Sequence, residues 1–119
     1  MAKKILIVDD QFGIRTLLTE VFQEDGFDTC DASNGKDAIQ LTYTEKPDLI
    51  LLDMKIPGMD GLDILRYLRE EDNGVDVIIM TAYGEADRMK EAKALGALAY
   101  IAKPFDIDYV RERVRELIS

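Results

Sequence analysis

The sequence predicts a single α/β domain built on a doubly wound, five-stranded parallel sheet. Its most apolar runs are short and do not alternate with polar residues, which is typical of strands covered on both faces. Segments with helical periodicity separate these runs, so strands and helices alternate along the chain. The chain has 119 residues, the size of one domain with one core, which leaves about 24 residues for each strand–helix unit.

Three strands are predicted from strongly apolar runs and two from weaker patterns. The strong runs are Ile5–Val8, Leu49–Leu52 and Val77–Met80, all dominated by leucine and β-branched residues. Asp28–Ala32 alternates like an edge strand, and Ala99–Ala102 is a short candidate near the end of the chain. These five segments complete the predicted sheet.

Five helices are predicted to connect and follow these strands. Gly26 ends the first helical pattern and Asn34 precedes the second, in the manner of helix-capping residues. The fifth pattern begins behind Asp106 and carries apolar residues at helical spacing. The predicted helices are Gly13–Asp25, Lys36–Glu45, Leu62–Glu71, Ala86–Leu95 and Ile107–Ile118.

The composition excludes several classes of function. Lys and Arg number 15 against 24 Asp and Glu, a formal net charge of −9, so nucleic acid is not expected as a partner. The absence of histidine excludes a Ser-His-Asp hydrolase and a histidine metal site. Cys30 is the one cysteine, so no internal disulfide is possible and a cytoplasmic location is expected. The apolar runs are too short for a signal peptide or a membrane span, and no membrane association is expected.

Polar side chains follow four of the five predicted strands. Asp9 and Asp10 come directly after the first strand and Asp53 after the third. Thr81 follows the fourth strand and Lys103 the fifth. Taken singly, each residue has an ordinary explanation as a helix cap, a strand end or a solvated lysine. Because sites in open α/β sheets form at the carboxyl ends of the strands, we expect these side chains to meet.

The expected cluster has the chemistry of a hard-cation site. Three carboxylates repel one another unless a cation neutralises them. Ligation by oxygen alone, without His or Cys, favours Mg²⁺, for which Mn²⁺ is a substitute. A metal beside a lysine and a hydroxyl is suited to phosphoryl transfer, in which a carboxylate nucleophile would form an acyl phosphate.

Over its whole length, the sequence resembles the receiver domain of two-component response regulators. Four stretches carry the resemblance: KILIVDDQFGIRTLL (4–18), PDLILLDMKIPGMDG (47–61), VIIMTAYGE (77–85) and LGALAYIAKPFDID (95–108). The acidic pair, the aspartate, the threonine and the Lys-Pro pair in this order are highly specific to that family. The resemblance implies a flavodoxin-like fold with strand order 2-1-3-4-5. We expect residues 1–119 to form one receiver domain without an output domain.

The resemblance implies a phosphoacceptor and a metal site. Asp53 matches the phosphoacceptor, and the side chains of Asp10 and Asp53 match those that bind Mg²⁺. Asp9 matches a residue that binds the metal mainly through water. Lys55 matches the residue that contributes its backbone carbonyl to the metal.

The resemblance also implies residues that respond to the phosphoryl group. Lys103 matches the lysine that pairs with the incoming group. Thr81 and Tyr100 match the switch residues, of which the threonine hydrogen-bonds the phosphoryl group and the aromatic ring rotates. The bond between Lys103 and Pro104 matches the family's cis peptide bond, which would aim the lysine at the site.

An apolar surface beside this site is expected to bind a helical partner. In the first predicted helix, Leu18, Val21 and Phe22 cluster around one direction, as core residues do. Ile14 and Leu17 lie toward the site and are expected to be partly exposed, although all five could also be core. The predicted partner-binding residues are Gln11, Gly13, Ile14, Leu17, Tyr83, Pro104 and Phe105.

Within the family, the runs DDQFGIR (9–15) and MKIPGMDG (54–61) are most similar to single-domain receivers of the sporulation phosphorelay. Such a receiver takes a phosphoryl group from the phosphohistidine of a sensor kinase and passes it to a histidine phosphotransferase. The lack of histidine in this chain fits that role, since both histidines come from partners. The resemblance thus implies a monomeric phosphotransfer intermediate rather than a conventional enzyme.

Three alternatives remain open from the sequence. A chemotaxis-type receiver would bind a target when phosphorylated and would never pass the phosphoryl group on. An aspartyl-phosphate hydrolase of the haloacid dehalogenase kind needs an Asp-x-Asp motif after the first strand, whereas this chain has Asp9, Asp10 and Gln11 there. A flavodoxin is disfavoured because the acidic pair would repel a flavin phosphate.

Overall fold

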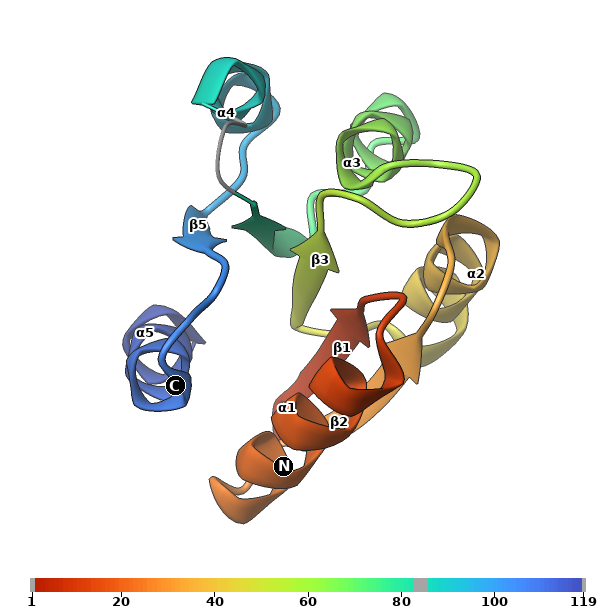
Figure 1. The fold of residues 1–119 in the computed structure, drawn as a ribbon. Coiled ribbons are helices and arrows are strands. Elements are labelled where there is room, and N and C mark those ends of the chain that lie inside the picture. The colour runs from red at the N-terminus through yellow and green to blue at the C-terminus, as the bar shows by residue number, and fades with distance from the viewer. Residues whose placement is uncertain (1, 83–85, 119) are drawn as a thin grey trace.

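Five parallel strands form one sheet in the computed structural model, which describes residues 2–82 and 86–118 of the chain (Figure 1). The strands are β1 (Lys4–Val8), β2 (Asp28–Ala32), β3 (Leu49–Asp53), β4 (Asp76–Thr81) and β5 (Ala99–Ala102). The helices are α1 (Phe12–Glu24), α2 (Gly35–Glu45), α3 (Gly61–Glu70), α4 (Ala86–Ala94) and α5 (Ile107–Ile118). The strand order β2-β1-β3-β4-β5 confirms the predicted fold, and each predicted element ends within one residue of the observed one.

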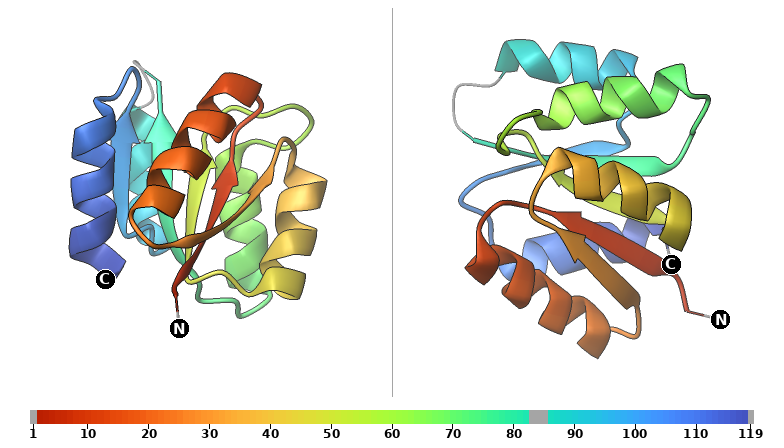
Figure 2. Two further views of the ribbon diagram at one scale, coloured as in Figure 1. Left: turned by 90° about the horizontal axis from the view of Figure 1, so that it is seen from below. Right: turned by 90° about the vertical axis from the view of Figure 1, so that its right-hand side faces the viewer.

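The helices cover both faces of the sheet and form two separate apolar layers. Helices α2, α3 and α4 lie on one face, and α1 and α5 lie on the other (Figures 1 and 2). Successive residues of β1 point to opposite layers: Leu6 and Val8 pack toward α2–α4, whereas Ile5 and Ile7 pack toward α1 and α5. A strand buried on both faces needs apolar residues at every position, which explains the unbroken apolar runs.

Capping interactions set the starts of two helices and the end of one. The side chains of Asn34 and Asp60 each accept a 2.9 Å hydrogen bond from the backbone N–H three residues later. Gly26 follows α1 with a φ of +92°, a left-handed conformation that glycine adopts without a steric penalty. No helix within residues 2–82 and 86–118 is long and apolar enough to cross a membrane.

Strand β2 lies at an edge of the sheet, as predicted, but the alternation expected for it is wrong. Thr29 and Cys30 are both half-buried, so burial does not change from one residue to the next. Cys30 packs against the α2–α4 layer. Burial raises the pKa of the Cys30 thiol, so the reactive thiolate form is disfavoured. This supports a packing role for Cys30.

The sheet directs its carboxyl ends to one edge of the molecule. Strands β1 and β3 are neighbours, with Val8 opposite Leu52. The residues that follow, Asp9 and Asp53, therefore emerge side by side. Strand β1 begins and helix α5 ends at the opposite edge (Figure 2). The topology thus brings together segments from the start, middle and end of the chain.

Asp25 joins helices α1 and α5 on the face away from α2–α4. Its side chain is only 10% exposed and receives two hydrogen bonds from Arg111, Nε to Oδ2 at 3.0 Å and Nη2 to Oδ1 at 2.6 Å. Arg115 lies 3.6 Å from the same carboxylate. The Arg111 hydrogen bonds, with the charge of both arginines, hold the pKa of Asp25 below its ordinary value, against the effect of burial.

The Asp25→Asn variant is expected to be less stable than wild type at neutral pH and to approach it in acid. Because the folded-state pKa lies below the ordinary value of about 4, the Asp25 carboxylate stabilises the fold above that value. This contribution is lost as the pH falls through the lowered pKa. Urea unfolding from neutral pH to about pH 3 measures it, with the exposed Glu20→Gln as control. If the difference in unfolding free energy between wild type and Asp25→Asn stays constant with pH, the ion pair does not have this role.

Candidate functional site

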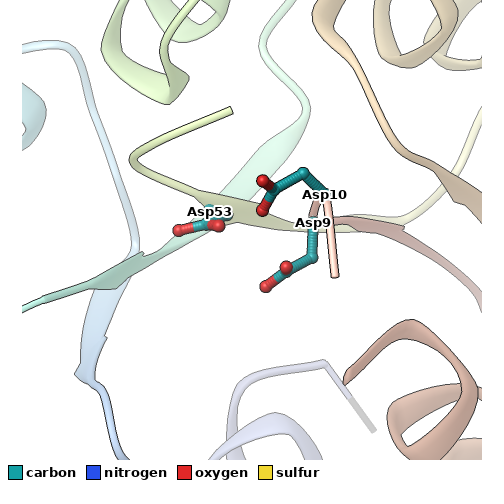
Figure 3. Close-up of side chains that lie close together, drawn as sticks. All are labelled: Asp9, Asp10 and Asp53. Carbon is teal, nitrogen blue, oxygen red and sulfur yellow. The ribbon is translucent and has the colours of Figure 1, made fainter. Parts of the chain in front are cut away.

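Three carboxylates meet where β1 and β3 end. Asp9 and Asp10 directly follow β1, and Asp53 is the last residue of β3 (Figure 3). Each offers an oxygen, and these oxygens lie within 4.8 Å of one another. Asp9 and Asp53 are buried, whereas Asp10 is exposed. The predicted convergence of the acidic residues is therefore present.

Asp9 is held by interactions from four directions. Its backbone N–H donates to the carbonyl of Ala32 at 3.1 Å, so the chain stays tied to β2 beyond the last paired residue. Its Oδ1 accepts a 2.9 Å hydrogen bond from the Gln11 N–H, and its Oδ2 accepts one from Lys103 Nζ at 2.7 Å. Its carbonyl oxygen accepts from Arg15 Nη1 at 2.8 Å. Hydrogen bonds of this kind offset the cost of burying a polar side chain.

Lys103 connects the last strand to the acidic cluster. Its Nζ lies 2.7 Å from Asp9 Oδ2 and 3.3 Å from Asp53 Oδ2. Burial by itself would lower the pKa of Lys103, but the two carboxylates outweigh burial, and the pKa lies above its ordinary value. The side chain is therefore an ammonium at neutral pH. The bond to Pro104 is cis, as the resemblance implied, and the Lys103 N–H donates to the Thr81 carbonyl at 2.7 Å.

Asp53 is a carboxylate in an unfavourable electrostatic position. Burial raises its pKa, the charge of Asp9 raises it further, and Lys103 only partly opposes both. A 3.4 Å hydrogen bond from the Lys55 N–H reaches its Oδ1. A further cation beside Asp53 would therefore be stabilising.

The site's donor set fits a hard divalent cation. Three carboxylates and the one ammonium of Lys103 leave two formal negative charges among these four groups. All the candidate ligand atoms are oxygens, which favours Mg²⁺ over metals that prefer nitrogen or sulfur. The acidic pocket thus has both the charge and the ligand type that such an ion needs.

Comparison with known proteins identifies the family. The model of the response regulator receiver domain matches residues 5–115. The chain belongs to this receiver family. The receiver is 56% identical over 118 residues to sporulation initiation phosphotransferase F of Bacillus subtilis (strain 168), covering 99% of this chain and 95% of that protein.

Other relatives agree with this assignment. The receiver is 34% identical to the chemotaxis protein CheY of Halobacterium salinarum, over 100% of this chain and 99% of that protein. Among solved structures, the receiver domain of the Francisella response regulator 1452 superposes with a TM-score of 0.89 and 35% identity. That match covers 97% of this chain and 95% of the other.

The two residues that resemble switch positions lie in different surroundings. Thr81 ends β4 and is buried, and its Oγ1 donates to the carbonyl of Ala82 at 3.0 Å. The hydroxyl would have to turn from this carbonyl to reach a phosphoryl group on Asp53. Tyr100 lies on β5 and is 58% exposed, so its ring is at the surface of the receiver.

Several of the predicted partner-binding residues line one hollow beside the site, with a volume of about 420 Å³. The lining residues are Gln11, Ile14, Leu17, Lys103, Pro104 and Phe105. Leu17 is 42% exposed and Ile14 is half-buried, whereas Leu18 and Phe22 of the same helix are fully buried. The predicted division of α1 into core and surface residues is therefore confirmed. Gly13 is exposed on α1 outside this lining, and Tyr83 lies outside the described residues.

Two further residues of the site, Gly61 and Arg15, were not predicted from the sequence. A Cβ atom at Gly61 would lie 3.0 Å from the Met54 Cα and even closer to the Asp53 carbonyl, so only glycine lets α3 begin this near the acceptor. Its position eight residues after Asp53, at a helix start, was the available signal. Arg15, which bonds the Asp9 carbonyl, has no sequence signal beyond its place in a helix after an acidic pair.

Proposed function

We propose that this receiver accepts a phosphoryl group on Asp53 from the phosphohistidine of a sensor kinase and passes it to a histidine phosphotransferase. It acts as a relay protein of a sporulation-type phosphorelay. The observation that carries this proposal is the buried Asp53 carboxylate with the Lys103 ammonium 3.3 Å away. Similarity to the Bacillus sporulation phosphotransferase over nearly its whole length supports the relay role.

The chemistry needs a carboxylate nucleophile and neutralisation of charge. An Asp53 oxygen attacks the phosphorus, the P–N bond of the phosphohistidine breaks, and its electron pair returns to the imidazole nitrogen. In the second transfer a partner imidazole attacks the phosphorus and the carboxylate leaves. The Lys103 ammonium lies where it can pair with the phosphoryl oxygens in both steps. The histidines of both steps belong to the partners, which agrees with a chain that has none.

We infer that Mg²⁺, or Mn²⁺ in its place, binds at the acidic pocket. Both oxygens of Asp9 already accept hydrogen bonds, which suits it to contact through water. Asp10 and Asp53 are then the direct side-chain ligands, with the Lys55 carbonyl as a further ligand. Such an ion supplies charge neutralisation for the transferring phosphoryl group.

Millimolar Mg²⁺ is expected to raise the melting temperature of the receiver. A ligand that binds only the folded state and is present at 100 times its Kd adds about 2.7 kcal/mol to the free energy of unfolding. The Asp10→Asn variant should be more stable than wild type without metal, because one repelling charge is gone, and should show no Mg²⁺ effect. Calorimetry with and without Mg²⁺ at constant ionic strength measures both changes. Equal melting temperatures for wild type in the two buffers would contradict the metal site.

We further propose that the hollow beside Lys103 receives an apolar face of a helical partner. Ile14 and Leu17 supply exposed apolar surface on α1, and Pro104 and Phe105 supply it on the loop after β5. A partner helix seated there would bring its histidine toward Asp53. Gln11 and the exposed Gly13 border this approach. Tyr83, which lies outside the described residues, is proposed as a further contact.

The function is tested by following a labelled phosphoryl group. Sensor kinases autophosphorylated with radioactive ATP are mixed with the receiver, and a histidine phosphotransferase is then added. The expected result is label on the receiver that moves to the phosphotransferase within the lifetime of the acyl phosphate. Label that reaches Asp53 but never leaves it for a histidine would instead indicate a chemotaxis-type receiver, a role supported by the similarity to CheY. Absence of label on the receiver would overturn both roles.

A further inference from the structure

Arg15 connects the edge strand of the sheet to the backbone of the acidic pair. It lies near the start of α1, and its side chain is only 15% exposed. Its Nη1 donates to the Asp9 carbonyl at 2.8 Å, and its Nε donates to Asp31 Oδ2 at 2.9 Å. The guanidinium carbon also lies 5.7 Å from the centre of the Phe12 ring. One planar guanidinium thus makes two directed contacts that a single ammonium does not reproduce.

The carbonyl that Arg15 holds belongs to the peptide group between Asp9 and Asp10. This group is planar, so fixing its oxygen fixes the direction in which the chain enters Asp10. The Ala32 carbonyl holds Asp9 from the N-terminal side through a 3.1 Å hydrogen bond. The carboxylate of Asp10 is exposed and accepts no hydrogen bond within residues 2–82 and 86–118. Its orientation therefore depends on the backbone that Arg15 holds.

Asp31 holds the guanidinium in turn. It lies on β2 directly opposite Ile7 of β1, so its backbone belongs to the hydrogen-bonded sheet. The sequence of contacts runs from β2 through Asp31 and Arg15 to the peptide group of the acidic pair. Each contact is a charge-assisted hydrogen bond, which is shorter and stronger than a neutral one.

We propose that Arg15, anchored by Asp31, is a positioning residue that orients the Asp9–Asp10 peptide group so that Asp10 faces the metal position. This inference rests on the proposed Mg²⁺ site and adds a residue that touches neither the metal nor the phosphoryl group. Outer residues that orient metal ligands commonly change affinity by about 10- to 100-fold when replaced.

Simple electrostatics predicts the opposite result for the loss of this arginine. A positive charge close to a cation site repels the cation, so removing the charge should tighten Mg²⁺ binding. A positioning role predicts weaker binding, because the Asp10 carboxylate would lose its fixed direction. The sign of the change in Kd therefore separates the two effects.

Titration calorimetry with MgCl₂ at fixed ionic strength tests the proposal on the whole chain. Arg15→Gln is expected to weaken binding by about tenfold. Arg15→Lys should also weaken it, although the charge is kept. Asp31→Asn should have a smaller effect in the same direction, since the bond to the Asp9 carbonyl remains. Arg113→Gln, which removes an equal charge from α5 where Arg113 pairs with Glu116, is the matched control and should bind as wild type does.

A second measurement separates positioning from a loss of folding. Each variant's melting curve gives its folded fraction, and phosphorylation by a small-molecule phosphodonor is followed against Mg²⁺ concentration. Saturating Mg²⁺ should restore the rate of Arg15→Gln toward wild type. An unchanged or lower Kd in Arg15→Gln, or in Arg15→Lys, would overturn the positioning role while leaving the metal site intact. A wild-type chain that binds no Mg²⁺ would overturn the metal site and the positioning role together.

Discussion

Replacing Asp53 with asparagine is expected to abolish phosphorylation and, at the same time, to make the metal-free receiver more stable. The amide of asparagine is not a nucleophile toward phosphorus, so acceptance should fall by at least about a thousandfold. Stability should rise because burial and the charge of Asp9 raise the pKa of Asp53, which means that folding disfavours its ionised form. Lys103 keeps its 2.7 Å partner Asp9 in the variant.

The gain in stability of Asp53→Asn is expected to depend on pH. Since the pKa of Asp53 is higher in the folded state than in the unfolded state, the ionised carboxylate costs stability at neutral pH. The advantage of Asp53→Asn should shrink as the pH falls through the raised pKa, where wild type takes up a proton. Phosphorylation assays and urea unfolding in the presence of a chelator measure the two effects. The control variant is Asp76→Asn, an exposed residue at the opposite edge of the sheet, which should change neither phosphorylation nor stability. If Asp53→Asn still accepts label, Asp53 is not the acceptor.

Adjacent leucines of α1 are expected to give opposite phenotypes. Leu18 is fully buried against the α5 side of the sheet, so Leu18→Ala should cost about 2–5 kcal/mol of unfolding free energy. Leu17 is 42% exposed in the hollow beside Lys103, so Leu17→Ala should change stability little. Its effect should appear in transfer to the histidine phosphotransferase, where a misplacement of about 1 Å can cost a hundredfold in rate.

Three measurements on the two variants separate core from docking surface. Urea unfolding gives the stability, a small-molecule phosphodonor gives acceptance without a protein partner, and labelled transfer gives the partner step. Leu17→Ala should accept the phosphoryl group from the small donor as wild type does and fail in transfer. A Leu17→Ala variant that unfolds much more easily and transfers normally would show that Leu17 is a core residue and that the docking surface lies elsewhere.

Local patterns in the sequence were sufficient to predict most of the architecture. The unbroken apolar runs predicted strands buried on both faces, and the helical periodicity between them predicted the alternation that produces a parallel sheet. Parallel strands place their carboxyl ends at one edge, so the convergence of Asp9, Asp53 and Lys103 followed from the residues after each run. The edge strand β2 is where this reasoning was least accurate. Thr29 accepts a hydrogen bond from Gln23 of α1, whereas Cys30 packs against the α2–α4 layer, and neither contact follows from the local alternation.

The sequence by itself therefore determined the elements, their alternation and the set of polar residues at the carboxyl edge, because these follow from periodicity over a few residues. Only the tertiary structure decided which atoms meet. Lys103 reaches Asp9 across 94 positions of the chain and lies closer to it than to Asp53. Gly61 and Arg15 act through the backbone of Asp53 and Asp9. Contacts of this kind depend on how elements remote in sequence pack together, and that packing leaves no periodic signal in the chain.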